Sequence, residues 1–90
     1  MSGDLEALRV FLTIIEVGSV KGASVELGIS RSKVRRTLET LERLVEVPLL
    51  WADSTGVHLT PAGRILQEHG TELIERHRAL LHAARKLADK

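Results

Sequence analysis

The sequence predicts a mainly α-helical fold, with three helices followed by a short β-hairpin and one long final helix. Hydrophobic residues recur three or four positions apart through most of the chain, which is the spacing of an amphipathic helix. Serine, threonine, glycine and proline stand where such helices would begin and end. With 90 residues, 43% of them hydrophobic, the chain is long enough for one small domain with a single core.

The first two helices are separated by a glycine. We expect the first helix to be capped by Asp4 and to stop at Gly18. Ser19 caps the second helix, Val20–Leu27, and Gly28 ends it. The apolar face of the first helix consists of Leu5, Leu8, Phe11, Leu12 and Ile15.

The third helix is expected to begin after the capping residue Ser30 and to end before Pro48, because the residue preceding a proline disfavours helical geometry. Only a glycine-centred turn joins it to the second helix, so the two must cross steeply, with the small Ala23 at the crossing. This is the helix-turn-helix arrangement, in which the N-terminal end of the following helix projects from the body. The apolar face of the third helix consists of Val34, Leu38, Leu41, Leu44 and Val45.

A hairpin is expected after the third helix. Leu49–Trp51 and Val57–Leu59 are strand-like, and they flank a polar, glycine-containing tip at Asp53–Gly56. Placed directly after a helix-turn-helix, such a hairpin is a wing. The predicted fold class is therefore a winged helix-turn-helix, mainly α, with three helices, a short β-hairpin wing and a long C-terminal linker helix.

The final helix is expected to start with Thr60 as its cap and Pro61 as its first residue, and to continue to Leu87. About 27 residues give a helix of roughly 40 Å, whereas a body of some 60 residues has a radius of about 11 Å. The first two turns can pack on that body, but the far half needs another chain to cover its apolar face. We therefore divide the chain into a winged helix-turn-helix domain, residues 1–60, and a linker and dimerisation helix, residues 61–90.

The apolar face of this last helix predicts a homodimer. Leucines recur every seven residues along it, which suits antiparallel or crossed packing of two such helices. A dimer would present two projecting helix ends about one turn of DNA apart, or a multiple of it. The predicted interface residues are Leu66, Leu73, His77, Leu80, Leu81, Ala84 and Leu87.

The start of the third helix is strongly basic. Residues 30–37 contain four positive charges and no acid, although a helix N-terminus carries partial positive charge and prefers acids. A polyanion opposite this end explains the pattern, and DNA phosphate is such an anion. We predict sequence-specific binding of double-stranded DNA in the major groove through Ser19, Lys21, Ser30, Arg31, Ser32, Lys33, Arg35 and Arg36.

Roles within this set follow from chemistry. Arg31 and Arg35 lie one turn apart on one face and can reach base edges, where a guanidinium binds guanine bidentately. Lys33 and Arg36 flank that face and suit backbone phosphates, which position the protein without specifying sequence. Ser19 and Lys21, at the start of the second helix, suit a phosphate on the other side of the groove. The Ser32 hydroxyl can contact either a base or a phosphate.

The overall charge does not favour nucleic acid. The net charge is +1, and residues 1–60 carry seven basic and eight acidic residues, a net of −1. Only local clustering can therefore attract DNA. Another possibility is a protein-interaction module that pairs with another regulator through its long helix and modulates it. An interaction module would show no DNA shift even at low salt, whereas a DNA binder loses affinity steeply as salt rises.

Other function classes find no support in the sequence. Cysteine is absent, and no two of the four histidines are four residues apart, so we expect no metal site. No nucleophile motif, phosphate-binding glycine loop or close carboxylate pair is found, so we expect neither an enzyme nor a cofactor. The longest early uncharged run, Val10–Ile15, is too short for a signal peptide or a membrane span, and we expect a cytoplasmic protein.

These residues resemble the N-terminal domain of LysR-type transcriptional regulators along nearly the whole chain. The residues that resemble the family's first helix and turn are Leu8, Phe11 and Glu16–Ser19, and those that resemble its helix-turn-helix are Ala23, Leu27 and Ile29–Ser30. Leu41–Glu42 resembles the end of its recognition helix, and Leu59–Gly63 resembles the motif after its wing, which is the most specific short motif present. The resemblance implies a winged helix-turn-helix, a dimer joined by the long helix, and a bacterial regulator. The similar N-terminal domain of ModE-like molybdate regulators is a second family candidate.

The chain also departs from the LysR pattern. The family usually has glutamine at the position of Arg31, proline or serine at that of Ser32, and serine at that of Arg35. The recognition end of this chain is therefore more basic than is usual in the family. The family has glycine where this chain has Glu46, and the family's wing carries an arginine where this chain has Ala52. The family's effector-binding domain does not follow, so we favour a fragment over a short stand-alone regulator. A small-molecule effector is expected only if such a C-terminal domain exists.

Overall fold

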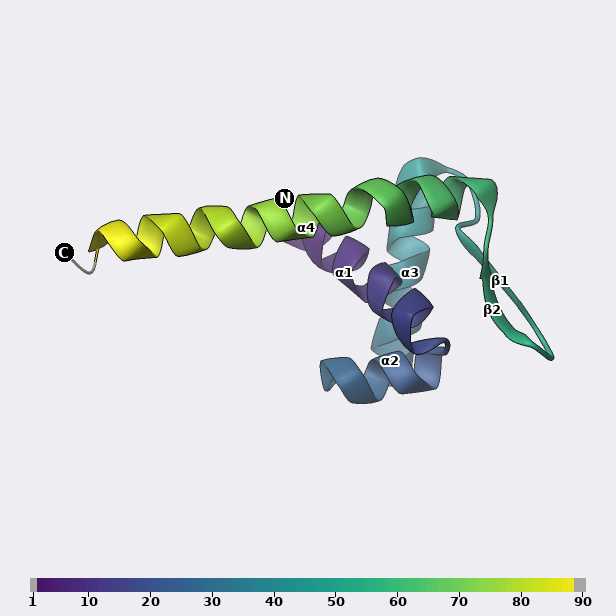
Figure 1. Cartoon of the computed structure of the whole chain (residues 1–90). Coiled ribbons are helices and arrows are strands. Elements are labelled where there is room, and N and C mark those ends of the chain that lie inside the picture. Colours follow the sequence, from purple (N-terminus) through teal and green to yellow (C-terminus); the bar gives the residue numbers. More distant parts are fainter. Residues whose placement is uncertain (1, 89–90) are drawn as a thin grey trace.

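The computed structural model describes residues 2–88, with side chains for residues 5–87. It confirms the predicted fold class: three helices, a two-stranded antiparallel hairpin and a long fourth helix (Figure 1). No helix within the described residues is both long and apolar enough to cross a membrane. The elements are α1 (Ser2–Val17), α2 (Val20–Leu27), α3 (Arg31–Val45), β1 (Leu50–Asp53), β2 (Gly56–Leu59) and α4 (Pro61–Ala88).

The boundaries of the helix-turn-helix are confirmed. The Ser19 hydroxyl accepts a hydrogen bond from the Gly22 amide at 2.9 Å and so caps α2. Gly28 ends α2 with a positive φ of 68°, a conformation that costs glycine little because it lacks a Cβ. The Ser30 hydroxyl accepts from the Lys33 amide at 3.0 Å and caps α3.

The start of α1 was predicted wrongly. The helix begins at Ser2, so Asp4 lies within its first turn instead of capping it. Helix ends are the least sharply encoded part of a helix, since the first turn has few hydrogen bonds of its own. The other end is as predicted, because Gly18 follows Val17 with a φ of 94° and stops the helix.

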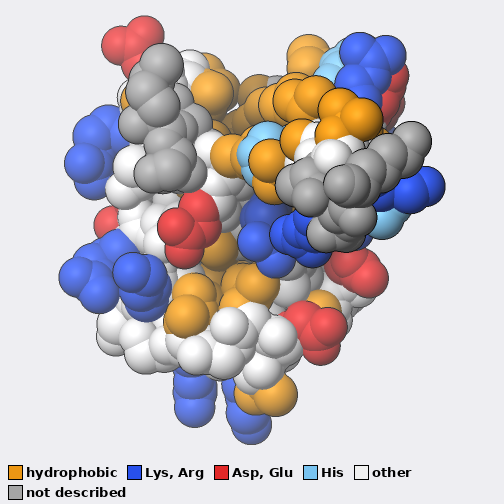
Figure 2. Space-filling model, turned by 90° about the vertical axis from the view of Figure 1, so that its left-hand side faces the viewer, with side chains coloured by type: hydrophobic (Ala, Val, Ile, Leu, Met, Phe, Trp, Pro, Cys, Tyr) orange, Lys and Arg blue, Asp and Glu red, His pale blue; other side chains and the backbone are white. Residues whose placement is uncertain are grey.

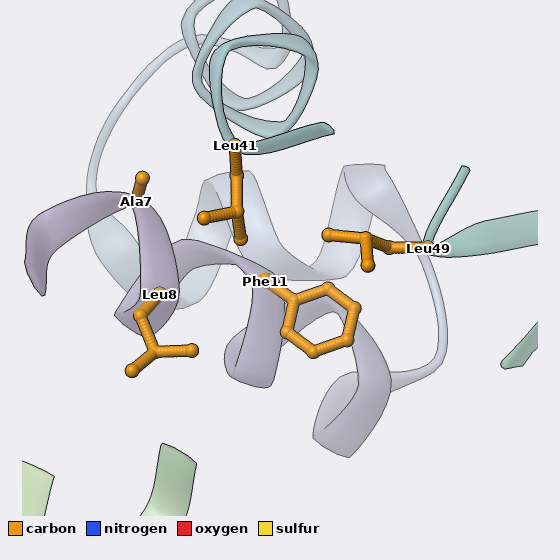
Figure 3. Packing of buried hydrophobic residues seen from close by; sticks show 5 residues of the cluster. All are labelled: Ala7, Leu8, Phe11, Leu41 and Leu49. Atoms are coloured by element: carbon orange, nitrogen blue, oxygen red, sulfur yellow. The ribbon is translucent and has the colours of Figure 1, made fainter. Parts of the chain in front are cut away.

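The core is built around α1, which contributes to two adjoining apolar clusters. Figure 3 shows the first cluster, in which Phe11 is fully buried between Leu41 of α3 and Leu49 of the following loop. Burying a side chain of this size contributes roughly 1.5–3 kcal/mol. The second cluster holds the helix-turn-helix together and consists of Val10, Ile14, Ala23 and Val34.

The last turn of α3 departs from the predicted apolar face. Val34 and Leu41 are buried as expected, but the side chains of Leu44 and Val45 are 56% and 38% exposed. The chain leaves the helix here through Glu46, which adopts a left-handed φ of 63°. Helical periodicity predicts which residues share a face, but it does not reveal where the covering elements end.

The hairpin is tighter than predicted. Leu50 pairs with Leu59 and Asp53 pairs with Gly56, so the turn contains only two residues. The Thr60 hydroxyl accepts from the Gly63 amide at 3.0 Å, which confirms it as the cap of α4. The same hydroxyl donates to the Pro48 carbonyl at 2.8 Å and so ties the start of α4 to the loop before the wing.

The two halves of α4 have different surroundings. Leu66 and Ile74 pack against the first cluster, and a Cβ on Gly70 would lie 2.9 Å from Leu8, so α1 and α4 approach closely there. The C-terminal half projects beyond the body in Figure 1. The side chains of Leu73, Leu80, Leu81 and Leu87 are 53–74% exposed. Leu66 therefore differs from the other predicted interface residues, because the chain's own core already holds it.

Candidate nucleic-acid interface

The N-terminal end of α3 forms a basic tip, defined as Ser30, Arg31, Ser32, Lys33, Arg35 and Arg36. All six residues are exposed, and so is Lys21 of α2, whereas Ser19 is half-buried. Figure 2 shows Lys and Arg side chains projecting from the lower end of the molecule, where α2 and the start of α3 lie in Figure 1. The fold thus brings the predicted residues of both helices to one end of the body.

The basic tip is not neutralised by the protein itself. Among the side chains of residues 5–87, ion pairs join Asp53 to His58 and Glu72 to Arg76. Within that part of the chain, no cation of the basic tip takes part in one. A helix N-terminus that gathers cations without an acid is electrostatically unfavourable on its own. An external anion would relieve this repulsion.

The tip residues lie on distinguishable sides of α3. Lys33 and Arg36 line a shallow hollow of about 380 Å³ between α3 and α1, where Glu6 is the acidic residue. Arg31 and Arg35 are four residues apart and share another side of the helix. The two pairs therefore lie on different sides of α3, and their separate roles on DNA stay a prediction.

Helical geometry also shows which tip residues point most directly away from the core. Val34 is fully buried, and residues two positions away lie about 200° around the helix. Ser32 and Arg36 occupy these positions and are exposed. Arg35, about 100° from Val34, points more to the side. The spacing of the apolar residues already places Val34 on the inner face of α3, so this signal was available in the sequence.

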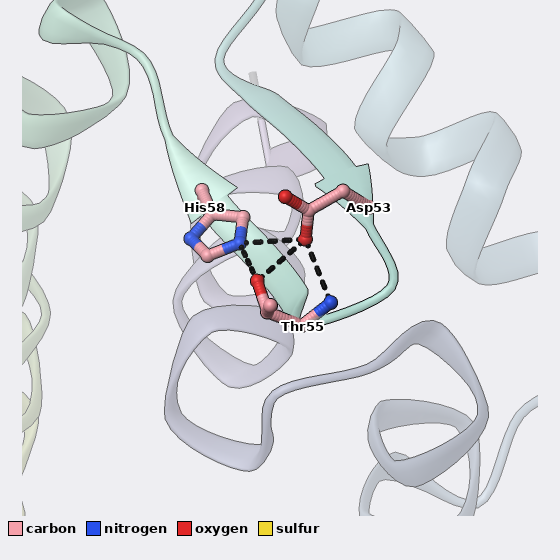
Figure 4. A network of polar contacts seen from close by, with 3 residues as sticks. All are labelled: Asp53, Thr55 and His58. Carbon is pink, nitrogen blue, oxygen red and sulfur yellow. Dashed lines mark hydrogen bonds and ion pairs between the residues drawn. The ribbon is translucent and has the colours of Figure 1, made fainter.

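The wing is organised by a network around an acid. The Asp53 carboxylate accepts from the Thr55 hydroxyl at 2.6 Å and from the Thr55 amide at 2.8 Å, and lies 3.0 Å from His58 Nε2 (Figure 4). These bonds, with those from Thr55 the largest, lower the pKa of the Asp53 carboxyl to about 2. Trp51 stacks on His58, its cross-strand partner, with the two ring centroids 4.3 Å apart.

The wing therefore carries a fixed negative charge at its tip. Residues 50–59 contain no lysine or arginine, so no permanent cation offsets Asp53. This charge would repel a phosphate rather than bind it. In the part of the chain that the structure describes, no three His, Asp or Glu side chains gather where they could hold a metal ion.

Comparison with known proteins places this geometry in a family. Residues 5–64 match the sequence model described as "Bacterial regulatory helix-turn-helix protein, lysR family". An uncharacterized HTH-type transcriptional regulator of Mycobacterium tuberculosis is 38% identical over 71 residues, 79% of this chain. The chain spans only 23% of that relative's length.

Solved structures with the same fold extend the comparison. The BenM DNA-binding domain in complex with the catB site 1 DNA superposes with a TM-score of 0.90 at 24% identity, over 96% of this chain and 97% of that one. The DNA complex of the CbnR DNA-binding domain gives a TM-score of 0.84 at 26% identity, over 93% and 97%. Together with the match of residues 5–64, these likenesses show that the chain belongs to the LysR family of bacterial helix-turn-helix regulatory proteins.

Proposed function

We propose that this chain binds double-stranded DNA sequence-specifically and is the DNA-reading part of a bacterial transcription regulator. The observation that carries the proposal is the basic tip, whose four cations are exposed and unpaired within the described residues. A helix end of this kind fits the major groove, which is wide enough to admit a helix. The CbnR domain, which has the same fold, was solved as a DNA complex.

Within the tip, we assign base contacts to Arg31 and Arg35 and phosphate contacts to Lys33. Arg36 points most directly outward, so it belongs with the base-reading candidates as well as with the phosphate contacts first assigned to it. At the start of α2, the Ser19 hydroxyl accepts its capping bond and keeps its own hydrogen to donate to a phosphate. Lys21 adds a charge beside it, which suits the opposite wall of the groove.

We further propose that the regulator is a homodimer joined through the far half of α4. Exposed leucines on one helix face are unfavourable in water, and burial against a second copy would remove them from it. Such a protein would act in the cytoplasm, where a bacterial chromosome lies. Because the aligned 71 residues span only 23% of the mycobacterial relative, an effector and its binding domain belong to the proposal only for a longer chain.

Selection of bound sites from a random DNA pool tests the DNA proposal directly. We expect enrichment of one sequence, with two half-sites if the protein binds as a dimer. Affinity for the selected site should fall with salt at a log–log slope of about −0.9 per phosphate contact. Failure to enrich any sequence, with no band shift at low salt, would refute sequence-specific binding.

The fixed negative charge on the wing favours a second candidate function, in which the chain is a protein-interaction module that pairs with another regulator. Asp53 at the wing tip and a net charge of −1 over residues 1–60 both disfavour DNA. Such a module would form a stable heterodimer through α4 and would remove the other regulator from its DNA. Titrating this protein into a band-shift assay of a related regulator distinguishes the two functions.

A further inference from the structure

The two faces of the wing have different surroundings. Leu50 pairs with Leu59 and Trp51 pairs with His58, and side chains alternate between the faces along each strand. Leu50 and Leu59 lie on the inner face and pack against the first core cluster. The opposite face, which we call the outer face of the wing, therefore carries Trp51, His58 and, two positions along β1, Asp53.

The outer face leaves a large aromatic side chain in water. The chain has one phenylalanine and one tryptophan, and Phe11 is fully buried in the core. Trp51 is 51% exposed although its ring stacks on that of His58. Exposure of so much apolar surface is unfavourable, and tryptophan is among the residues that contribute most to binding at protein interfaces. The wing thus presents a flat aromatic surface that the chain itself does not cover.

Asp53 supplies a charged acceptor beside this surface. Thr55 and His58 both contact its Oδ1 atom, and among the side chains of residues 5–87 no hydrogen bond or ion pair to Oδ2 is found (Figure 4). The lowered pKa of Asp53 keeps the carboxylate ionised, and each of its oxygens can accept hydrogen bonds. Oδ2 is therefore available to a donor from another molecule.

An aromatic ring next to a carboxylate matches the side chain of arginine. A guanidinium is planar, stacks on tryptophan and donates to carboxylate oxygens through several N–H groups. His58 holds the two parts of the outer face together, because its ring stacks on Trp51 and its Nε2 atom lies 3.0 Å from Asp53. Residues 50–59 contain no lysine or arginine of their own. The charge of Asp53 attracts a cation and repels a DNA phosphate.

We propose that the outer face of the wing is a docking site for an arginine side chain of a partner protein, a role that does not depend on the proposed DNA binding. The guanidinium stacks on Trp51 and donates to Oδ2 of Asp53. Figure 1 shows the wing at the opposite end of the molecule from the far half of α4. A partner held by the wing therefore leaves that half of α4 free for another chain.

An NMR titration of the ¹⁵N-labelled chain tests this inference, with a blocked glycine pentapeptide that has arginine at its centre as the probe. Trp51 is the only tryptophan, so a single indole N–H signal reports on the outer face. We expect saturable shifts of this signal and of the amides of residues 50–59. The matched lysine peptide should bind about threefold more weakly, because an ammonium cannot stack flat on the ring or donate as a planar fork. The matched glutamine peptide should give no shift.

Two variants separate the contributions of the ring and the carboxylate. Trp51→Leu keeps an apolar side chain and should abolish the preference for arginine over lysine, as read from the amides of β1 and β2. Asp53→Asn should weaken binding of the arginine peptide about threefold. Glu75→Gln is the matched control, because it removes an exposed carboxylate roughly 20 Å along α4 from Pro61 and should leave binding unchanged. The dispersion of each spectrum shows whether the variant is folded, and if Trp51→Leu is not, Asp53→Asn and the peptide comparison decide.

Three results would overturn the proposal. The first is equal binding of the arginine and lysine peptides to the wild type, or shifts that lie outside the wing. The second is an undiminished affinity of folded Asp53→Asn for the arginine peptide. The third is a shift of the Trp51 indole signal by a random DNA duplex but not by the arginine peptide, which would assign the outer face to DNA instead.

Discussion

The start of α3 and the far half of α4 both expose side chains that are unfavourable in their present surroundings, but the two surfaces differ in chemistry. At the basic tip, four exposed cations crowd a helix end that already carries partial positive charge. On the far half of α4, leucines more than half exposed form an apolar face. A polyanion is the partner proposed for the first surface and a second copy of α4 for the second, because each would supply what the surface lacks.

Changing the apolar surface should have the largest effect. The double variant Leu73→Asp and Leu80→Asp places four charges in a dimer interface, which should give monomers by sedimentation. A DNA site with two half-sites should then bind about 10²–10⁴-fold more weakly, since the two tips are no longer linked. Ile65→Asp is the control, because Ile65 is 61% exposed on α4 but lies outside the far half. An unchanged dimer in the double variant would place the interface elsewhere.

Changing the basic tip should leave the dimer intact and weaken DNA binding. Arg31→Ala or Arg35→Ala should cost about 1–3 kcal/mol at a selected site and relax the preference at one base pair. Lys33→Ala should weaken binding to all sequences alike and reduce the salt slope by about 0.9. Arg36→Ala shows whether Arg36 reads a base, in which case the preference at one base pair relaxes, or binds a phosphate, in which case all sequences are affected alike. Arg64→Ala, on α4, controls for the loss of one charge; equal losses at specific and random DNA would refute base reading.

A change between the two surfaces should alter stability alone. Glu46 adopts a left-handed conformation where the family has glycine, and such a conformation costs a side-chain-bearing residue roughly 1–2 kcal/mol. Glu46→Gly should therefore stabilise the fold by about 0.5–1 kcal/mol, after the entropy cost of glycine. Thermal unfolding measures the gain, with Glu46→Ala as the control that keeps the strain. If Glu46→Gly unfolds at a lower temperature than the wild type, the claim that Glu46 is strained is wrong.

Among the changes that affect DNA binding, one in the wing should have the smallest effect. Asp53→Asn removes the fixed negative charge from the wing tip and should raise affinity for random DNA by up to about fivefold. The same substitution tests a pH effect. Because the pKa of Asp53 is lowered to about 2, its stabilising contribution is present above about pH 4 and is lost as the pH falls toward 2. The free energies of unfolding of the wild type and of Asp53→Asn should therefore converge at low pH. If both proteins unfold at the same pH with the same stability above it, the Asp53 network does not stabilise the fold.

Sequence reasoning succeeded where structure depends on residues close together. The caps Ser19, Ser30 and Thr60 each bond an amide three residues ahead, so each was visible in the sequence. It failed at Leu44, which shares the periodicity of a buried face but extends beyond any covering element. The wing network was also missed, because a cross-strand contact with Asp53 depends on a register that was predicted too loosely.

The sequence by itself determined the order of elements, the helix-turn-helix and the basic tip, because capping bonds, glycine turns and charge clusters act over a few residues. Only the tertiary structure decided which parts of each apolar face remain uncovered. Leu66 and Leu73 are seven residues apart on one helix face, yet the first packs on α1's core cluster and the second is exposed. That difference arises from where α1 lies against α4, and contacts between such distant segments are set only when the whole chain has folded.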